Sequence, residues 1–409
     1  MKVAKKLLYF LHEFCHMNHS KLKYLLGTQQ HRFSLEQPFY TDNEIFEAEW
    51  EKIWKKYWLF AGTVAEIPRP GDYFLYKLHN DSIIIIRGNN GEVHAHYNTC
   101  RHRGSLICTE EKGRAVKLVC PYHQWVYDKD GSLQKARLMP EDFDTCDYSL
   151  HSVNVQVAAG LIFISLAENP PAFDKVREDY LPFLGPFNIS EAKVGFQKTY
   201  SLRTNWKLIA ENFRECYHCG PAHPEYCSAV IGANMKESAD EVLAERRVEW
   251  ERNGLAVNNI NFREDTFHFA IRYPLRPGVQ SYSTDGTAVA IPMGDHQDYN
   301  AGVLGLVVYP NFWMDAVSDY IWTMRLTPVS ASETRIDLSW LVDKNAVEGK
   351  DYTVDRLVEF WKITGEQDWK LCENNFSGIE SSRYTPGPYA PVEADVVQFI
   401  DWYLKQMGA

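Results

Sequence analysis

The segment Cys100-Arg-His102 is followed, after 17 residues, by Cys120-Pro-Tyr-His123. Each segment places one cysteine and one histidine within a few residues of each other. Around them, short runs of β-branched and aromatic residues alternate with Gly, Asn and Asp, which predicts strands over 72–76, 82–86, 116–119 and 160–166. Many short strands with turn signals between them are typical of a small β-barrel or sandwich. The sequence therefore predicts a small β domain that carries two Cys–His loops.

The ligand order in these loops favours a Rieske [2Fe–2S] cluster, in which two thiolates hold one iron and two imidazoles hold the other. One pair per loop, Cys100 with His102 and Cys120 with His123, lets the loops bind the cluster from both sides. A Cys₂His₂ zinc site is the alternative, but it typically has both cysteines in one segment and both histidines in another. Because imidazole ligands raise the reduction potential, we expect a centre that relays electrons.

A second group of metal-ligand residues occupies 205–223, which reads as a helix that ends at Gly220-Pro221. His223 would then fold back toward His218. Two imidazoles and one carboxylate form the facial triad of non-haem Fe(II) oxygenases, which leaves positions open for O₂ and substrate. A histidine pair alone is more often structural, but a cluster that delivers electrons needs an acceptor. On such a helix three side chains share one face: Glu211, Glu215 and His218.

The carboxylate ligand has to come from elsewhere, because Glu211 and Glu215 lie too close in sequence to the histidines. A helical pattern near the C-terminus carries three acids, Glu366, Asp368 and Glu373, and physical reasoning alone leaves the choice among them open.

Composition limits the class of protein. The 409 residues carry a net charge of −11, with 45% hydrophobic and 24% charged residues, as in ordinary globular chains. This acidic balance disfavours nucleic-acid binding, and no apolar run reaches the roughly 18 residues that span a membrane. The start imitates a secretory signal, but its apolar run 7–11 is too short, so we expect a short helix or arm and a cytoplasmic protein.

The nine cysteines do not suggest a disulfide framework. Two are cluster candidates, and the other seven are expected to pack in the core. Cys216-x-x-Cys219 imitates a redox motif, but helical geometry would point both thiols away from the face of His218. Beyond about residue 167, helical segments alternate with strands expected over 301–309, 321–326 and 335–342, which predicts an α+β domain.

These two motifs together resemble the oxygenase (α) component of the Rieske non-haem iron oxygenases, from about Phe33 to Met407. The resemblance implies an N-terminal arm with helices that packs on the catalytic domain (1–44), a β-rich Rieske domain (45–166) and a helix-grip catalytic domain that holds the mononuclear iron (167–409). It implies a [2Fe–2S] cluster and a mononuclear Fe(II). Seven residues match the metal ligands of the family: Cys100, His102, Cys120 and His123 for the cluster, and His218, His223 and Asp368 for the iron.

Within this family the chain is most similar to the branch of glycine betaine monooxygenase and proline betaine (stachydrine) demethylase. The similar stretches are 100–105, 117–125, 165–171, 214–219, 345–352 and 384–389, and Glu215 stands where aromatic-ring dioxygenases usually carry Asp. The resemblance implies oxidative removal of an N-methyl group from a quaternary ammonium compound, with release of formaldehyde. The chain departs from this branch at Asn311-Phe-Trp-Met-Asp315, where the branch has Trp-Asn-His.

The resemblance also implies partners: a flavin/iron–sulfur reductase that uses NAD(P)H, O₂, and a homotrimer in which each cluster serves the iron of a neighbour. Glu215 would bridge His218 and a Rieske histidine, expected to be His123, across the interface. Asn212 is the second candidate catalytic residue.

A quaternary ammonium group has no N–H donor, so its recognition relies on aromatic faces. The candidate substrate contacts are Trp313, Phe312 and Tyr282, with Arg272 as a partner for a substrate carboxylate. The alternative function is a ring hydroxylase or dioxygenase that acts on an aromatic acid. A third reading, an electron-transfer Rieske protein without chemistry of its own, requires the second motif to be structural.

Overall fold

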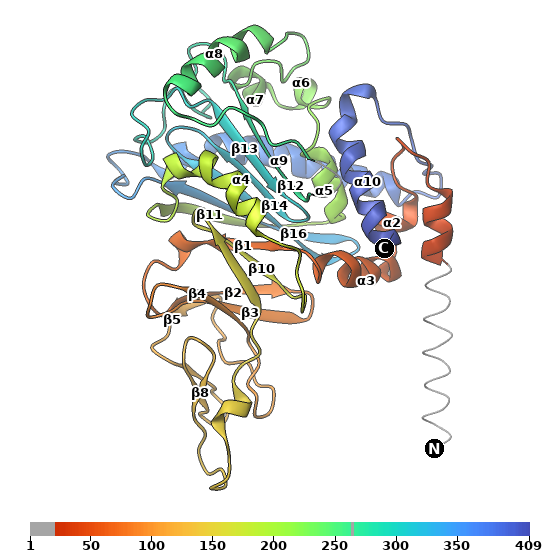
Figure 1. Ribbon diagram of the computed structural model, residues 1–409. Coiled ribbons are helices and arrows are strands. Elements are labelled where there is room, and N and C mark those ends of the chain that lie inside the picture. Colours follow the sequence, from red (N-terminus) through yellow and green to blue (C-terminus); the bar gives the residue numbers. More distant parts are fainter. Residues whose placement is uncertain (1–20, 263–265) are drawn as a thin grey trace.

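The computed structural model describes residues 21–262 and 266–409, so the arm expected over the first residues lies mostly outside the described part. Residues 21–28 are helical, and short helices follow: α2 (Gln37–Thr41), α3 (Asn43–Glu49) and a π-helical turn over Trp50–Trp54. Within the described residues no helix is both long and apolar enough to cross a membrane. Figure 1 shows a strand-rich part below a larger mixed part, which confirms the predicted α+β class.

The strand-rich part contains three small antiparallel sheets, with strand orders β1-β10-β9, β4-β3-β2-β5 and β6-β7-β8. The strands are β1 (Leu59–Thr63), β2 (Asp72–Leu78), β3 (Asp81–Arg87), β4 (Val93–Tyr97), β5 (Lys112–Arg114), β6 (Leu118–Val119), β7 (Val126–Tyr127), β8 (Leu133–Lys135), β9 (Asn154–Ala158) and β10 (Leu161–Ser165).

Four consecutive isoleucines explain how this part is joined to the rest. Ile83 to Ile86 on β3 are all fully buried, because the two faces of the strand meet two different cores. Ile83 and Ile85 belong to the main core of the molecule, whereas Ile84 and Ile86 belong to a smaller core. The smaller core also contains Cys100 and Cys120, together with Trp125 and Tyr127. The Cys–His loops therefore lie on a packed hydrophobic base.

The larger part is built on one six-stranded antiparallel sheet with the order β11-β16-β15-β14-β13-β12. Its strands are β11 (Lys193–Leu202), β12 (His268–Tyr273), β13 (Val303–Val308), β14 (Phe312–Ala316), β15 (Ile321–Ser330) and β16 (Glu333–Val342). The strands predicted over 301–309, 321–326 and 335–342 are therefore present. The helices are α4 (Asp174–Leu184), α5 (Trp206–Asn212), α6 (Cys219–Ala222), α7 (Pro224–Ala229), α8 (Asp240–Arg252), α9 (Val354–Ile379) and α10 (Ala394–Gly408).

The long helix α9 covers one face of this sheet. Its 26 residues extend over roughly 39 Å, and Trp361 stacks on Trp322 of β15 with ring centroids 4.1 Å apart. On the other face, Phe312 of β14 contacts Phe60 of β1 with centroids 4.3 Å apart. The sheet thus lies between α9 and the Rieske-like strands, and side chains that alternate along β14 point to different neighbours.

The irregular segment 166–173 joins β10 to α4. We propose that the boundary between the β domain and the catalytic domain lies here, at 166/167. The short N-terminal helices contact the larger part: the hydroxyl of Tyr40 on α2 donates to the carboxylate of Glu211 on α5 (2.8 Å).

Candidate metal centres and active site

The two Cys–His loops have the same backbone geometry. In the first, the N–H of Gly104 donates to the carbonyl of Cys100 (2.9 Å), and in the second the N–H of Gln124 donates to the carbonyl of Cys120 (3.0 Å). The residue four positions after each cysteine has a left-handed backbone, with φ of 77° at Gly104 and 61° at Gln124. This repeated turn brings the side chain between, His102 or His123, to the outer end of each loop.

The donor atoms of the two loops approach in pairs, imidazole with imidazole and thiol with thiol. Nδ1 of His102 and Nδ1 of His123 lie 3.1 Å apart at the exposed tip, and both thiols are buried beneath them. The hydroxyl of Tyr127 lies 3.3 Å from Sγ of Cys100, where it can donate to a thiolate. Two imidazoles facing outward and two thiols facing inward fit one [2Fe–2S] cluster held by separate loops.

The second motif differs from its predicted secondary structure. The single helix expected to end at Gly220-Pro221 is wrong, because α5 ends at Asn212 and Gly220 lies inside the separate turn α6. The carboxylate of Glu215 accepts hydrogen bonds from the backbone N–H groups of Tyr217 and His218, which replaces the helical pattern by a local turn. Glu211 points elsewhere, toward the hydroxyls of Tyr40 and Tyr389.

This turn and α9 bring three potential metal ligands together. Nε2 of His218 lies 3.3 Å and Nε2 of His223 lies 2.9 Å from Oδ1 of Asp368, and the three ligand atoms lie within 4.8 Å of one another. Asp368 is only 4% exposed, although burial normally disfavours a charged carboxyl. Two imidazoles and a carboxylate beside a cavity are the donor set of a facial-triad Fe(II) site.

The structure also separates Asp368 from the two other acids on the same helix. Glu366 is exposed and accepts from the hydroxyl of Tyr200 (3.4 Å), while Glu373 accepts from the backbone N–H of Arg203 (3.1 Å). Both therefore face the outside of α9, and only Asp368 faces the histidines.

Each iron-site histidine has a hydrogen-bond partner for its second ring nitrogen. Nδ1 of His218 donates to Oε1 of Glu215 (2.5 Å), and Nδ1 of His223 donates to Oε1 of Gln367 (2.7 Å). Burial opposes protonation of His218, but the hydrogen bonds to Asp368 and Glu215 outweigh it and raise its pKa to about 9. The site therefore attracts positive charge. Asn212 lies 3.4 Å from Nε2 of His218 through its amide nitrogen.

Gln367 was not predicted from the sequence, and it provides a test of the site. We expect Gln367→Ala to weaken iron binding by about 10- to 100-fold, because His223 loses the partner that orients its ring. Iron titration of the apo-protein measures the change, and the Rieske absorbance should stay intact. Lys370→Ala, on the exposed side of the same helix, is the matched control. Equal iron affinity in the two variants would contradict the role of Gln367.

A cavity of about 70 Å³ adjoins the three ligands. Its walls contain aromatic side chains, and of the residues that the structure describes none of those lining it is Lys or Arg. The residues that line it are Asn212, Phe213, Glu215, Cys216, His218, Cys219, His223, Tyr226, Tyr273, Trp313, Asp315, Trp361, Thr364 and Asp368.

Of the four predicted substrate contacts, only Trp313 lines this cavity. Phe312 was wrongly predicted, because neighbours on a strand point to opposite faces and its ring packs on Phe60. Tyr282 lies behind the wall, where its hydroxyl is 2.7 Å from that of Tyr273. Arg272 is also wrong: its guanidinium is 2% exposed and donates to the carbonyls of two alanines away from the cavity, Ala256 and Ala301.

The prediction that all seven remaining cysteines pack in the core is also corrected. The structure pairs Cys216 with Cys219 as a disulfide, because the turn brings the two thiols together, whereas a continuous helix would have sent both into the core. Cys108 and Cys372 are buried as expected, but Cys146 is exposed. Cys15 lies outside the described residues.

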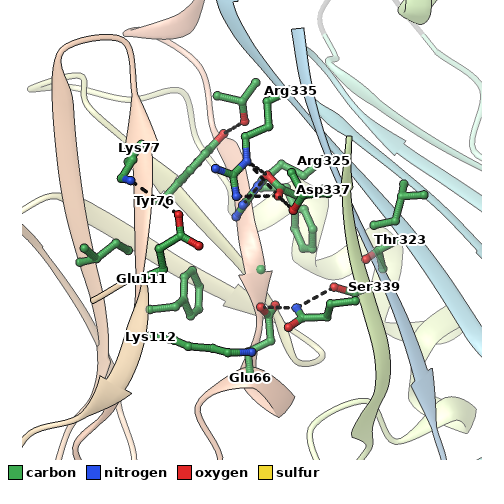
Figure 2. Close-up of a pocket in the computed structure, with 18 of the residues that line it drawn as sticks. Glu66, Tyr76, Lys77, Glu111, Lys112, Thr323, Arg325, Arg335, Asp337 and Ser339 are labelled. Carbon is green, nitrogen blue, oxygen red and sulfur yellow. Dashed lines mark hydrogen bonds and ion pairs between the residues drawn. The ribbon is translucent and has the colours of Figure 1, made fainter. Parts of the chain in front are cut away.

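Two of the larger cavities border the triad or the interface between the domains. One, of about 340 Å³, is lined by Glu211, Asn212, Glu215 and the potential metal ligand His218. The other, of about 230 Å³, lies between the β domain and the catalytic sheet (Figure 2). Most of the charges in Figure 2 are already paired: Asp337 accepts from Arg325 and Arg335, and Lys77 pairs with Glu111. This second cavity is therefore a polar domain interface rather than a site of chemistry.

Comparison with known proteins agrees with both metal motifs. Residues 57–154 match the Rieske [2Fe–2S] domain, and residues 189–409 match the ring hydroxylating alpha subunit (catalytic domain). The chain belongs to the Rieske non-haem iron oxygenases. A curated relative, the glycine betaine monooxygenase oxygenase subunit of Pseudomonas aeruginosa (strain UCBPP-PA14), is 39% identical over 94% of this chain and 91% of its own length. The predicted family, domain types and cofactors of this Rieske oxygenase are thus confirmed.

Solved structures show the same fold. A quaternary ammonium Rieske monooxygenase superimposes with a TM-score of 0.72 at 24% identity, over 94% of this chain and 98% of that chain. A naphthalene 1,2-dioxygenase superimposes with a TM-score of 0.68 at 21% identity, over 93% of both chains. Because the fold is shared by both kinds of Rieske oxygenase, the substrate class has to be argued from the cavity.

Proposed function

We propose that this chain is the oxygenase component of a Rieske monooxygenase that oxidatively N-demethylates a quaternary ammonium, betaine-like substrate. The observation that carries the proposal is the cavity beside His218, His223 and Asp368. Its aromatic side chains and three carboxylates suit a cationic head group, and it offers no Lys or Arg, among the described residues, to an aromatic acid.

The relatives support the same class. The 39% identical relative is named for glycine betaine, and other relatives, 34–38% identical over about half of this chain, are named for carnitine. Two observations, the aromatic walls of the cavity and the Glu at position 215, agree with this branch. The ring hydroxylase that acts on an aromatic acid remains the competing function, and it shares the metal ligands.

The reaction balances as follows. One oxygen atom of O₂ enters a C–H bond of an N-methyl group, and the other leaves as water, with two electrons and two protons consumed. The hydroxymethyl ammonium then loses formaldehyde and a proton and leaves the tertiary amine. A separate reductase, which we propose to be a flavin/iron–sulfur protein fed by NAD(P)H, supplies the electrons.

Within this scheme the residues of the chain have distinct tasks. Cys100, Cys120, His102 and His123 would hold the cluster, which relays single electrons, and the triad would hold the iron, which activates O₂. Glu215 and Gln367 fix the two iron-site imidazoles so that both Nε2 atoms face Asp368. The aromatic walls keep water away from the substrate head group.

Electron transfer is proposed to run between subunits of a homotrimer. In Figure 1 the tip that carries β8 lies at the opposite end of the molecule from α6, which His218 and His223 flank, and it is also remote from α9, which carries Asp368. The cluster of one chain is therefore far from its own iron, whereas His102 is exposed and available to a neighbour. Glu215 would accept from His218 within its own chain and from His123 of the neighbouring subunit.

The test is turnover of a panel of quaternary ammonium compounds and aromatic acids with NADH, a reductase and O₂. We expect formaldehyde in a 1:1 ratio to consumed substrate with at least one quaternary ammonium compound. Diols or phenols formed from an aromatic acid, without formaldehyde from any cation, would overturn the proposal in favour of the competing function.

A further inference from the structure

The carboxylate of Asp315 is buried beside the iron-site cavity without a full set of partners. It is 4% exposed, and Oδ1 has no hydrogen-bond partner among the described residues. Its Oδ2 accepts one long hydrogen bond, from the hydroxyl of Tyr273 (3.4 Å). A buried carboxylate normally has hydrogen bonds or a cation to compensate the loss of water. Burial raises the pKa of Asp315 to about 7, and the side chains of Trp313 and Tyr273, which lower it, offset this effect only in part.

The position of Asp315 makes it part of the substrate cavity rather than of the core. On β14 it follows Trp313 by two residues, so both side chains point to the face of the sheet that carries the cavity. Tyr226 lies close enough to both carboxylates to interact with them, because the negative charges of Asp315 and Asp368 both raise the pKa of its phenol. The unpaired carboxylate thus shares one cavity with the iron-site ligands.

The carboxylates of the cavity carry enough negative charge to balance the iron and one further cation. Three carboxylates line it, those of Glu215, Asp315 and Asp368, and the described lining contains no Lys or Arg. An iron(II) ion held by the triad would neutralise two of these charges and leave one. The charge that remains without a partner in the chain is the one on Asp315.

The aromatic walls alone offer a weak cation site. Arg214 is buried against the ring of Trp313, with its guanidinium carbon 5.3 Å from the ring centroid. One cation already uses this ring, so its attraction for a second cation is reduced. A negative charge on the wall therefore matters more here than in a cage made of rings alone.

We infer that Asp315 is the specificity-determining residue that recognises the positive charge of the substrate, with the ammonium head group inside the cavity and the rest of the substrate toward its mouth. This inference rests on the proposed function and extends it, because it assigns the charge selectivity to one side chain. The cavity would accept the N-methyl head of a cation and reject a neutral group of the same shape.

The test compares each quaternary ammonium compound with its carbon isostere, which has the same shape but lacks the positive charge, on the holoenzyme. The probes are choline with 3,3-dimethylbutan-1-ol, and glycine betaine with 3,3-dimethylbutanoate, and calorimetry gives the dissociation constants. We expect the cation of at least one pair to bind tighter than its isostere, and Asp315→Asn to reduce that preference by at least about tenfold. Asp315→Glu should retain the preference. Asp401→Asn, which removes an exposed carboxylate on α10, should not change it.

Two results would overturn the inference: no preference for either cation in the unchanged protein, or a preference that survives loss of the charge. If Asp315→Asn does not fold, as judged by the Rieske absorbance and thermal unfolding, Asp315→Ser removes the charge with a smaller side chain and gives the same comparison. Formaldehyde release with an unchanged preference would refute only the role of Asp315. Absence of formaldehyde from every cation would refute the proposed function itself.

Discussion

Asp368→Ala is expected to lose the mononuclear iron and to keep the Rieske spectrum. The carboxylate is the only acidic side chain of α9 that faces both histidines, and without it the two imidazoles make an incomplete site. Turnover should fall by more than the roughly 10- to 100-fold that the loss of an outer hydrogen-bond partner costs. Metal analysis with visible spectroscopy on the same sample measures both centres.

The matched controls for this experiment lie on the same helix. Glu366→Ala and Glu373→Ala remove acids that bind Tyr200 and the backbone of Arg203 instead, so both variants should retain iron. Retained iron in Asp368→Ala, or its loss in either control, would show that a different carboxylate completes the site.

Glu215→Gln is expected to separate electron storage from product formation. The cluster should still be reduced at the normal rate, and iron should remain bound. Product formation should fall steeply, by on the order of 100-fold, because an amide cannot accept hydrogen bonds from two imidazoles through both of its polar atoms. Single-turnover experiments, in which a pre-reduced cluster is mixed with O₂ and substrate, measure the rate of cluster reoxidation.

Glu211→Gln is the control, since this carboxylate lies one turn earlier and binds two tyrosine hydroxyls instead of the iron-site imidazole. Its effect on cluster reoxidation should be much smaller. Normal reoxidation in Glu215→Gln would remove the proposed bridge and leave Glu215 a purely local partner of His218.

The Rieske loops were readable from the sequence because each is a local unit. The ligands of one loop lie within four residues, and the left-handed turns at Gly104 and Gln124 are contained in the same stretch. The iron site was only half readable. The spacing of His218 and His223 indicated a pair, but Asp368, the proposed third ligand, lies 145 residues after His223 in the chain, where helical periodicity left three acids open.

The wrong predictions at 212–220 and at Phe312 have related causes. In each, a hydrogen bond or the geometry of a strand decided the structure, and local residue type did not. Glu215 hydrogen-bonds to the backbone and ends the helix that propensity would continue. Phe312 and Trp313 were equally aromatic candidates until the pleat of β14 placed them on opposite faces. The same alternation, applied at the sequence level, would have pointed to Asp315 as the partner of Trp313.

The fate of the N-methyl carbon is the most direct test of the proposed N-demethylation. A quaternary ammonium substrate with one N-trideuteromethyl group is turned over by the holoenzyme with its reductase, and both products are analysed by mass spectrometry. N-demethylation at the labelled group would yield dideuterated formaldehyde together with an amine that has lost the labelled carbon. Oxygenated products that retain every N-methyl carbon, with no formaldehyde, would contradict N-demethylation.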